Sequence, residues 1–261
     1  MKLGIVYLYP DLMNIYGDYG NILCLIRRCR WRGIEVEVRN VSIGDEIAPG
    51  AYDLYFFGGG QDQQQKIVSQ DLQKGKGEEL LEAVEERGAV ILSICGGYQL
   101  LGRYYKPLQG EEVVGVGLFD AYTVAGSKRM VGDIVTRLQE ARLMRYVPHD
   151  TLVGFENHSG KTYLGEGCRP LAKVLSGHGN NGEDGTEGAV YKNAFGTYLH
   201  GSLLPKNPHL ADHLIQLALK RRYGEVELES LDDGLEWEAH RAAISNSCLT
   251  LGGMVWRRRG R

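Results

Sequence analysis

The residues with the clearest chemical pattern surround Cys95. The run Ser93-Ile94-Cys95-Gly96-Gly97 follows an apolar segment and has small residues two positions away on either side of the cysteine. This is the cysteine form of a nucleophile elbow, a sharp strand-to-helix turn in which a bulky neighbour would collide. The turn also places the sulfur near a helix N-terminus, whose partial positive charge favours the thiolate. A free cysteine is more often a small buried hydrophobe, but this context predicts a nucleophile for acyl transfer.

A second glycine run predicts the partners of that nucleophile. Gly58-Gly59-Gly60 follows a buried strand that should neighbour the strand before Cys95. Alone it would be read as a tight turn. Beside a thiolate, the N–H groups of Gly59, Gly60 and Gly96 are candidates for an oxyanion hole, which stabilises a tetrahedral intermediate.

The base that such a nucleophile needs is best placed at His200. It follows the apolar segment 195–199 and precedes Gly201. The His200 side chain should therefore lie at the end of a strand, where no neighbouring side chain blocks access to it. His158 is the second choice, and the histidines of the two C-terminal helical patterns are expected at the surface. The seven histidines are His149, His158, His178, His200, His209, His213 and His240.

Composition limits the other classes of function. The five cysteines are scattered without a C-x-x-C pair, which disfavours a disulfide framework and a metal site. A net charge of −3 predicts no nucleic-acid partner, and the basic end 256–261 is expected to be a solvated tail or a contact for an acidic partner. No apolar run is long enough to cross a bilayer and no signal-peptide pattern opens the chain, so we expect a cytoplasmic protein without a transmembrane segment.

The elements that position these residues alternate in the first half of the chain. Apolar or alternating runs predict strands, and helical spacing predicts helices between them, with a Gln-rich loop after Gly60. This rhythm implies a parallel sheet with ligands at the carboxyl ends of its strands. The predicted strands are 3–8, 34–38, 53–57 and 89–94, and the predicted helices are 20–32 and 77–87.

The second half has a different character. Short strand patterns with few helices predict an antiparallel extension or hairpins, at 115–122, 131–138, 152–157, 172–175, 189–192 and 195–199. Two helices are expected at 208–223 and 228–243. We therefore predict one catalytic domain over residues 1–223 and a helical C-terminal appendage with a basic tail over residues 224–261.

These motifs together resemble the class I (triad-type) glutamine amidotransferases, in particular their cobyric-acid-synthase-like branch. The resemblance spans most of the chain and implies an α/β, flavodoxin-like three-layer fold with a central, mostly parallel sheet. Within that branch, four further motifs resemble the glutaminase subunits of lipid II isoglutaminyl synthases. They are Tyr16-Gly17-Asp18-Tyr19-Gly20-Asn21, Gly154-Phe155-Glu156-Asn157-His158, Gly179-Asn180-Asn181-Gly182-Glu183-Asp184 and Leu204-Pro205-Lys206-Asn207.

The resemblance also implies residue roles. Many triad enzymes have a glutamate two positions after the catalytic histidine, whereas this chain has Ser202 there. The branch commonly manages with a Cys–His pair, and either Asp18 or Glu156 remains open as the residue that orients His200. Arg129 is implied to hold the substrate carboxylate, against the alternative of an exposed loop cation. Gln99 is implied to line the same pocket.

The implied reaction is hydrolysis of L-glutamine to glutamate and ammonia through a Cys95 thioester. The chain has no G-x-x-x-x-G-K-[ST] loop, so we expect no cofactor in it. ATP and magnesium are implied on a Mur-ligase-like synthetase, with which this chain would form a heterodimer at the inner face of the membrane. By the same resemblance, that partner is expected to amidate the D-glutamate of lipid II. The alternatives are another acceptor, such as a corrinoid, and a non-catalytic regulatory module on the same fold.

Overall fold

The computed structural model describes residues 1–140 and 150–250, with side chains as far as Ser247. The basic tail at 256–261 and His149 lie outside the described residues, as does the side chain of Cys248. No helix in the part of the chain so described is long and apolar enough to cross a membrane.

A six-stranded sheet forms the centre of the molecule. Its order is β11-β12-β4-β3-β1-β2, and every neighbouring pair is parallel except β11 and β12. The strands are β1 (Lys2–Leu8), β2 (Glu35–Val41), β3 (Leu54–Phe57), β4 (Val90–Ile94), β11 (Ala189–Tyr191) and β12 (Ala194–Thr197). The predicted central, mostly parallel sheet is therefore confirmed.

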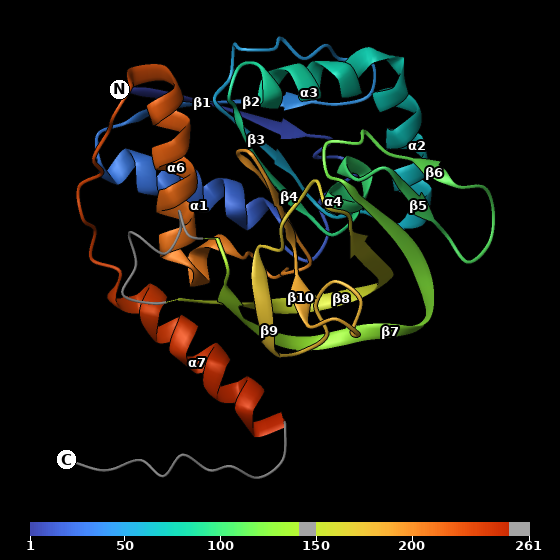
Figure 1. Ribbon diagram of the computed structural model, residues 1–261. Coiled ribbons are helices and arrows are strands. Elements are labelled where there is room, and N and C mark those ends of the chain that lie inside the picture. The colour runs from blue at the N-terminus through green and yellow to red at the C-terminus, as the bar shows by residue number, and fades with distance from the viewer. Residues whose placement is uncertain (141–149, 251–261) are drawn as a thin grey trace.

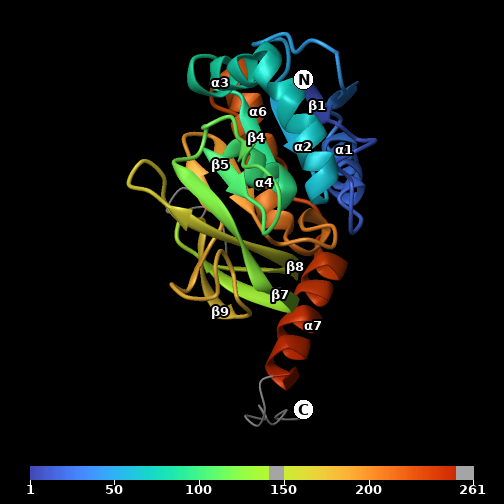
Figure 2. The same cartoon turned by 90° about the vertical axis from the view of Figure 1, so that its right-hand side faces the viewer.

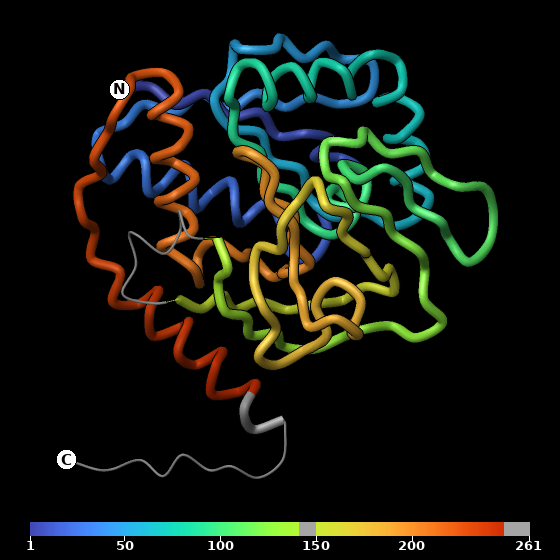
Figure 3. Tube along the Cα trace, viewed as in Figure 1, coloured from blue at the N-terminus to red at the C-terminus, as the bar shows by residue number. Residues whose placement is uncertain are grey.

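Helices cover both faces of this sheet and complete the three-layer α/β fold (Figure 1). On one side α1 (Tyr19–Trp31) packs against α6 (Pro208–Tyr223), two helices from opposite ends of the chain that cross in the view of Figure 3. On the other side lie α2 (Asp62–Asp71), the π-helical turn η1 (Leu72–Lys76), α3 (Gly77–Glu85) and α4 (Gly96–Leu101).

Helix α2 occupies the segment that the sequence predicts as a Gln-rich loop, so that prediction is wrong. The helix has no apolar stripe to reveal it, because its buried face consists of Gln65, Val68, Ser69 and Asp71. Glutamine nevertheless favours helix nearly as well as leucine does. Burial of polar residues here places amide and carboxylate groups next to the end of β3.

A second, mostly antiparallel sheet lies at the lower end of the first in Figure 1. Its order is β10-β9-β7-β5-β6, with β8 paired to β7. The strands are β5 (Tyr104–Lys106), β6 (Val113–Val114), β7 (Ala121–Leu138), β8 (Thr151–Leu164), β9 (Ala172–Ser176) and β10 (Thr186–Glu187). The predicted antiparallel region is present as a sheet of its own, and β7 and β8 are longer than the short strands expected. The strand expected at 115–122 is not formed, since most of that segment connects β6 to β7.

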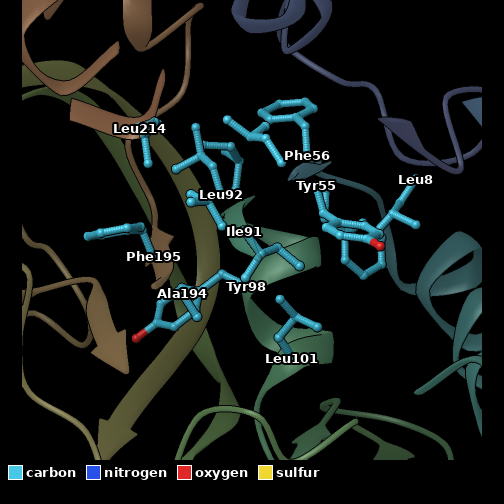
Figure 4. Close-up of a cluster of buried hydrophobic side chains, with 14 of the residues drawn as sticks. Leu8, Tyr55, Phe56, Ile91, Leu92, Tyr98, Leu101, Ala194, Phe195 and Leu214 are labelled. Atoms are coloured by element: carbon cyan, nitrogen blue, oxygen red, sulfur yellow. The ribbon is translucent and has the colours of Figure 1, made fainter. Parts of the chain in front are cut away.

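The core between sheet and helices is apolar and fully enclosed. Figure 4 shows part of this core, with Leu92, Phe195 and Leu214 close together and with Leu8, Ile91 and Leu101 also labelled. These side chains are 0% exposed, and burial of each contributes roughly 1.5–3 kcal/mol to stability. A rigid core of this kind fixes the strand ends at which chemistry is expected.

The C-terminal part continues from α6 to α7 (Gly234–Thr250), which begins later than the predicted start at Leu228. Helix α7 contacts β7, β8 and the short 3-10 helix η2 (Leu204–Lys206), and Figure 2 shows it beside the second sheet. His240 and His213 are buried, contrary to the expected surface positions. The His240 ring hydrogen-bonds to Thr151 (2.9 Å) and to the Lys206 carbonyl (2.7 Å). The side of α7 that carries His240 therefore faces the rest of the domain. The boundary after Tyr223 stays a prediction.

Candidate active site

Cys95 lies in a sharp turn between β4 and α4. Its backbone has φ 47° and ψ −105°, a positive φ that non-glycine residues rarely adopt. The turn is closely surrounded: a Cβ added to Gly97 would lie 2.6 Å from the Phe57 carbonyl oxygen, and one added to Gly96 would lie 2.8 Å from the Gly60 nitrogen. The two glycines therefore let the β4–α4 turn pack directly against the end of β3.

His200 lies beside this turn because its strand is the neighbour of β4. Thr197 of β12 pairs in parallel with Ile94 of β4, so both strands end at the same edge of the sheet. The Cys95 N–H donates to the Thr197 carbonyl (2.8 Å). His200 is then fixed by two backbone hydrogen bonds to Phe155 of β8, at 2.8 and 3.2 Å. The two sheets thus meet at the histidine.

A buried carboxylate, that of Asp18, holds one ring nitrogen of His200. Its Oδ1 lies 3.3 Å from His200 Nδ1, and its Oδ2 accepts a 2.7 Å hydrogen bond from the Gly59 N–H. Asp18 and His200 are both 0% exposed. Glu156, the other open candidate, instead accepts hydrogen bonds from the backbone and the ring of His178. Of the two carboxylates, only Asp18 is placed to orient His200.

Ser202 stands where many triad enzymes have a glutamate, and it supports the loop that carries Asp18. Its hydroxyl donates to the Gly17 carbonyl (2.7 Å). A side chain on Gly20 would collide with Ser202, so the two segments are in close contact. The carboxylate next to the histidine therefore comes from a different part of the chain than in the triad pattern.

The neighbours of His200 raise its pKa to about 10. Burial by itself would lower this pKa, but the neighbouring Cys95 sulfur and the Asp18 carboxylate both raise it. Among the described residues, no group hydrogen-bonds to the buried His200 Nε2. A thiolate–imidazolium pair, the reactive form of a cysteine nucleophile, suits this arrangement.

A cavity of about 460 Å³ opens onto Cys95, within the size range of small-molecule sites. Gln99 lines it, is 5% exposed, and donates its side-chain N–H to the Tyr198 hydroxyl (2.9 Å). Arg129 also lines it, and its Nε–H donates to Asn157 Oδ1 (2.6 Å). The structure therefore brings both predicted binding residues into one cavity with the cysteine.

The predicted backbone donors divide into two groups. Gly60 lines the cavity, and Gly96 adjoins it through the close backbone approach described above. Gly59 differs from the prediction, because its N–H already donates to Asp18. Its place is in the support of His200, while Gly60 and Gly96 remain the candidates for contact with substrate.

His158, the second choice for the base, also lines the cavity but is held in another way. Its ring stacks on Tyr198, with centroids 3.6 Å apart and planes 7° apart, and its Nδ1 lies 2.8 Å from the Gly160 carbonyl oxygen. Several cavity residues were not anticipated, among them Asp62, Gln65 and Tyr105. The first two follow Gly60 closely in sequence, and the loop prediction for this segment concealed them.

In the part of the chain that the structure describes, no group of three or more His, Cys, Asp or Glu residues is placed to hold a metal ion. The four cysteines whose side chains are described, Cys24, Cys29, Cys95 and Cys168, are all free thiols.

Fold and site together define a glutamine amidotransferase, and comparison with known families agrees. Residues 4–208 match the model of the CobB/CobQ-like glutamine amidotransferase domain. The chain therefore belongs to this family. The match covers all the residues of the proposed site and ends at the start of α6.

Two curated relatives are similar over most of their length. The chain is 41% identical over 239 residues to "Lipid II isoglutaminyl synthase (glutamine-hydrolyzing) subunit GatD" of Streptococcus pneumoniae, which covers 91% of this chain and 88% of the relative. It is 39% identical over 246 residues to the protein of the same name from Staphylococcus aureus, covering 94% and 96%. A cobyric acid synthase of Limosilactobacillus reuteri is 33% identical over 192 residues, which are 69% of this chain and 34% of that protein.

Solved structures support the fold alone. A glutamine amidotransferase from Thermotoga maritima superposes with a TM-score of 0.54 at 16% identity, covering 95% of this chain and 94% of that one. A glutamine amidotransferase from Methylobacillus flagellatus has a TM-score of 0.52 at 11% identity, covering 100% and 99%. The flavodoxin-like, class I amidotransferase fold is thereby confirmed.

Proposed function

We propose that this chain is the glutaminase subunit of a two-subunit amide ligase, and that it hydrolyses L-glutamine through a thioester on Cys95. The observation that carries this proposal is that Cys95 and His200 follow adjacent strands and meet beside a cavity, where Asp18, from the loop before α1, contacts His200. The proposed nucleophile therefore lies beside its acid/base partner, and a third group orients that partner, as in other nucleophile–base pairs.

In the first half-reaction the Cys95 thiolate attacks the carbon of the glutamine side-chain amide. The carbonyl electrons move to the oxygen, and the N–H groups of Gly60 and Gly96 stabilise the resulting oxyanion. The His200 imidazolium donates its proton to the amide nitrogen, the C–N bond breaks, and ammonia leaves. A glutamyl thioester on Cys95 and a neutral His200 remain.

In the second half-reaction a water molecule attacks the thioester. His200 Nε2 accepts a proton from the water, the C–S bond breaks, and glutamate leaves. The thiolate and the imidazolium are restored. Asp18 keeps the other ring nitrogen protonated and the ring in place throughout, as carboxylates do in related triads.

The ammonia is useful only if an activated carboxylate receives it. The sequence has no nucleotide-binding loop, so we propose that a Mur-ligase-like partner binds ATP and magnesium. Two curated relatives that match over most of their length are named as subunits of lipid II isoglutaminyl synthase. Their names support lipid II as the acceptor. We propose that its D-glutamate is amidated, by a heterodimer at the cytoplasmic face of the membrane. A corrinoid acceptor is less well supported, because the cobyric acid synthase shares a lower identity over less of this chain.

Co-expression with candidate synthetases tests this function. The Cys95→Ser protein should still bind the Mur-like partner, lose glutamine-dependent amidation of lipid II, and keep amidation with added ammonium. Cys168→Ser is the matched control, because burial raises the pKa of that thiol to about 11 and keeps it unreactive. Full glutamine-dependent activity in Cys95→Ser would contradict the mechanism, and recovery of a corrinoid synthetase instead would contradict the acceptor.

A further inference from the structure

Helix α2 presents two acceptor groups to the cavity beside Cys95. Asp62 and Gln65 lie three positions apart, which places them on the same face of the helix, and both line the cavity. The Asp62 carboxylate accepts a 3.1 Å hydrogen bond from the hydroxyl of Tyr105, a buried residue on β5. Its position is therefore fixed from the neighbouring sheet.

Gln65 has an acceptor that the protein leaves without a partner. Its side chain is 3% exposed, and its amide N–H donates to the Gly60 carbonyl (3.1 Å). This bond orients the amide, but Gln65 Oε1 has no hydrogen-bond partner among the described residues. A buried acceptor without a donor is costly, so a donor group on a ligand would remove this cost.

The charges on the cavity wall are arranged for a zwitterion. Asp62 is the only carboxylate that lines the described cavity, and Arg129 on β7 is the only arginine or lysine. Asp62, Cys95 and Arg129 line the same cavity, together with Tyr105. An α-amino acid with its side chain toward Cys95 carries an ammonium and a carboxylate of the required signs.

We infer that Asp62 and Gln65 bind the α-ammonium group of the amino-acid substrate, while Arg129 pairs with its α-carboxylate. This inference rests on the proposed function, since it takes free L-glutamine as the ligand. The three N–H donors of an ammonium suit an anionic and a neutral acceptor on one helix face. The subsite would select free glutamine over amides that lack the α-amino group.

The position of Asp62 in the first turn of α2 has a simpler explanation, namely stabilisation of the helix dipole. That explanation accounts for its charge but not for Tyr105 or the orphan acceptor of Gln65. The two explanations also differ in what they predict. A helix-stabilising role changes folding, whereas an ammonium subsite changes discrimination between ligands with and without the amine.

Binding to the full-length Cys95→Ser chain separates these explanations, because turnover is blocked. Calorimetry would compare L-glutamine with 4-carbamoylbutanoate, which is glutamine without its α-amino group. Adding Asp62→Asn should weaken L-glutamine binding ~10- to 100-fold, as expected for loss of a charged hydrogen bond, and leave the analogue unchanged. Gln65→Met should act in the same direction. Glu111→Gln, which alters an exposed carboxylate outside this cavity, should change neither affinity.

Three results would overturn the subsite. They are an unchanged L-glutamine affinity in Asp62→Asn, equal weakening of the binding of both ligands, and no binding of L-glutamine to the Cys95→Ser chain. The proposed function fails separately, if the wild-type chain with its partner hydrolyses no glutamine while Asp62-dependent binding is observed. In the active complex, the subsite further predicts that Asp62→Asn raises KM by a similar factor and leaves kcat nearly unchanged.

Discussion

At the scale of single residues, the proposed reactivity depends on contacts that lead from Asp18 through His200 to Cys95. Asp18 Oδ1 lies 3.3 Å from His200 Nδ1. Because Asp18 contacts His200, its carboxylate should affect the rate more than substrate binding. Hydrogen bonds to charged groups are worth about 1.5–3 kcal/mol.

The Asp18→Asn variant tests this role. It keeps the shape of the side chain but removes the charge, and we expect kcat of the complex to fall ~10- to 100-fold with little change in KM. Because the Asp18 carboxylate helps to raise the pKa of His200, the alkaline limb of the kcat/KM profile should move to lower pH. Glu156→Gln should leave that limb in place. An unchanged limb and rate in Asp18→Asn would show that His200 works without this carboxylate.

Glu187 gives a second prediction at this scale, for stability. It is buried, and desolvation raises its pKa from 4.5 to about 7, against the opposing hydrogen bonds from Thr197 and Tyr198. Below pH 4.5 the carboxyl is protonated in both the folded and unfolded states and has no effect. As the pH rises from about 4.5 to about 7, the unfolded state releases its proton first, so the free energy of unfolding falls by about 3 kcal/mol.

Urea unfolding of wild type and Glu187→Gln across this range measures the effect. The difference between the two proteins should shift in favour of the variant as the pH rises, and then level off above pH 7. A difference that stays constant from pH 4.5 to 8 would contradict the assignment.

Sequence reasoning found the residues whose neighbours along the chain identify them. Small residues around Cys95 and the strand before His200 are local signals. Asp18 could not be selected over Glu156 in this way, because it lies 182 positions from His200 in sequence. The choice between them depends on how the loop after β1 meets the end of β12.

At the scale of elements, the β4–α4 turn and the end of β3 behave as one unit. A Cβ at Gly97 would lie 2.6 Å from the Phe57 carbonyl and 2.8 Å from the Gly58 carbonyl. Backbone atoms cannot move aside as a flexible side chain can. Their close approach explains why glycine is required at this position, two residues after Cys95.

Gly97→Ala should therefore destabilise the protein by about 1–3 kcal/mol, the usual cost of overpacking, measured by chemical unfolding. Gly234→Ala is the control, because its Cβ would meet the side chain of Asp232 at 3.2 Å, at the exposed start of α7. Equal stability of the two variants would indicate that the turn can relax.

Elements were predictable where hydrophobic burial sets the pattern. Strands β1, β3 and β4 are continuous apolar runs, and α6 follows the predicted range. Helix α2 was missed because polar residues form its buried face. Strand β7 was predicted only over 131–138, because the segment before it, Ser127 to Arg129, is exposed and polar. In both cases tertiary contacts override the local pattern, and both elements line the cavity.

At the scale of the whole molecule, Arg28 joins distant parts of the chain. This arginine of α1 is 1% exposed and pairs with Asp212 of α6 at 2.7 Å and with Asp233, just before α7, at 2.6 Å. Arg32 also pairs with Asp212. The predicted C-terminal appendage is thus tied to the domain by buried charge.

Arg28→Met should cost about 3–5 kcal/mol of unfolding free energy, because it leaves a partly buried carboxylate without its cation. Arg87→Met is the matched control: its pair with Glu82 is exposed, and such pairs contribute about 0–1 kcal/mol. Thermal or urea unfolding compares the two. Equal effects would mean that the appendage is held by packing alone.

The most direct test of the central claim is covalent trapping at Cys95. The purified chain with its partner would be treated with a glutamine-derived diazoketone and digested, and the labelled peptide would be identified by mass spectrometry. We predict stoichiometric labelling of Cys95 alone, protected by L-glutamine and absent in Cys95→Ser. No label on Cys95 in the presence of the partner, or a label on another residue, would contradict the assignment of the nucleophile.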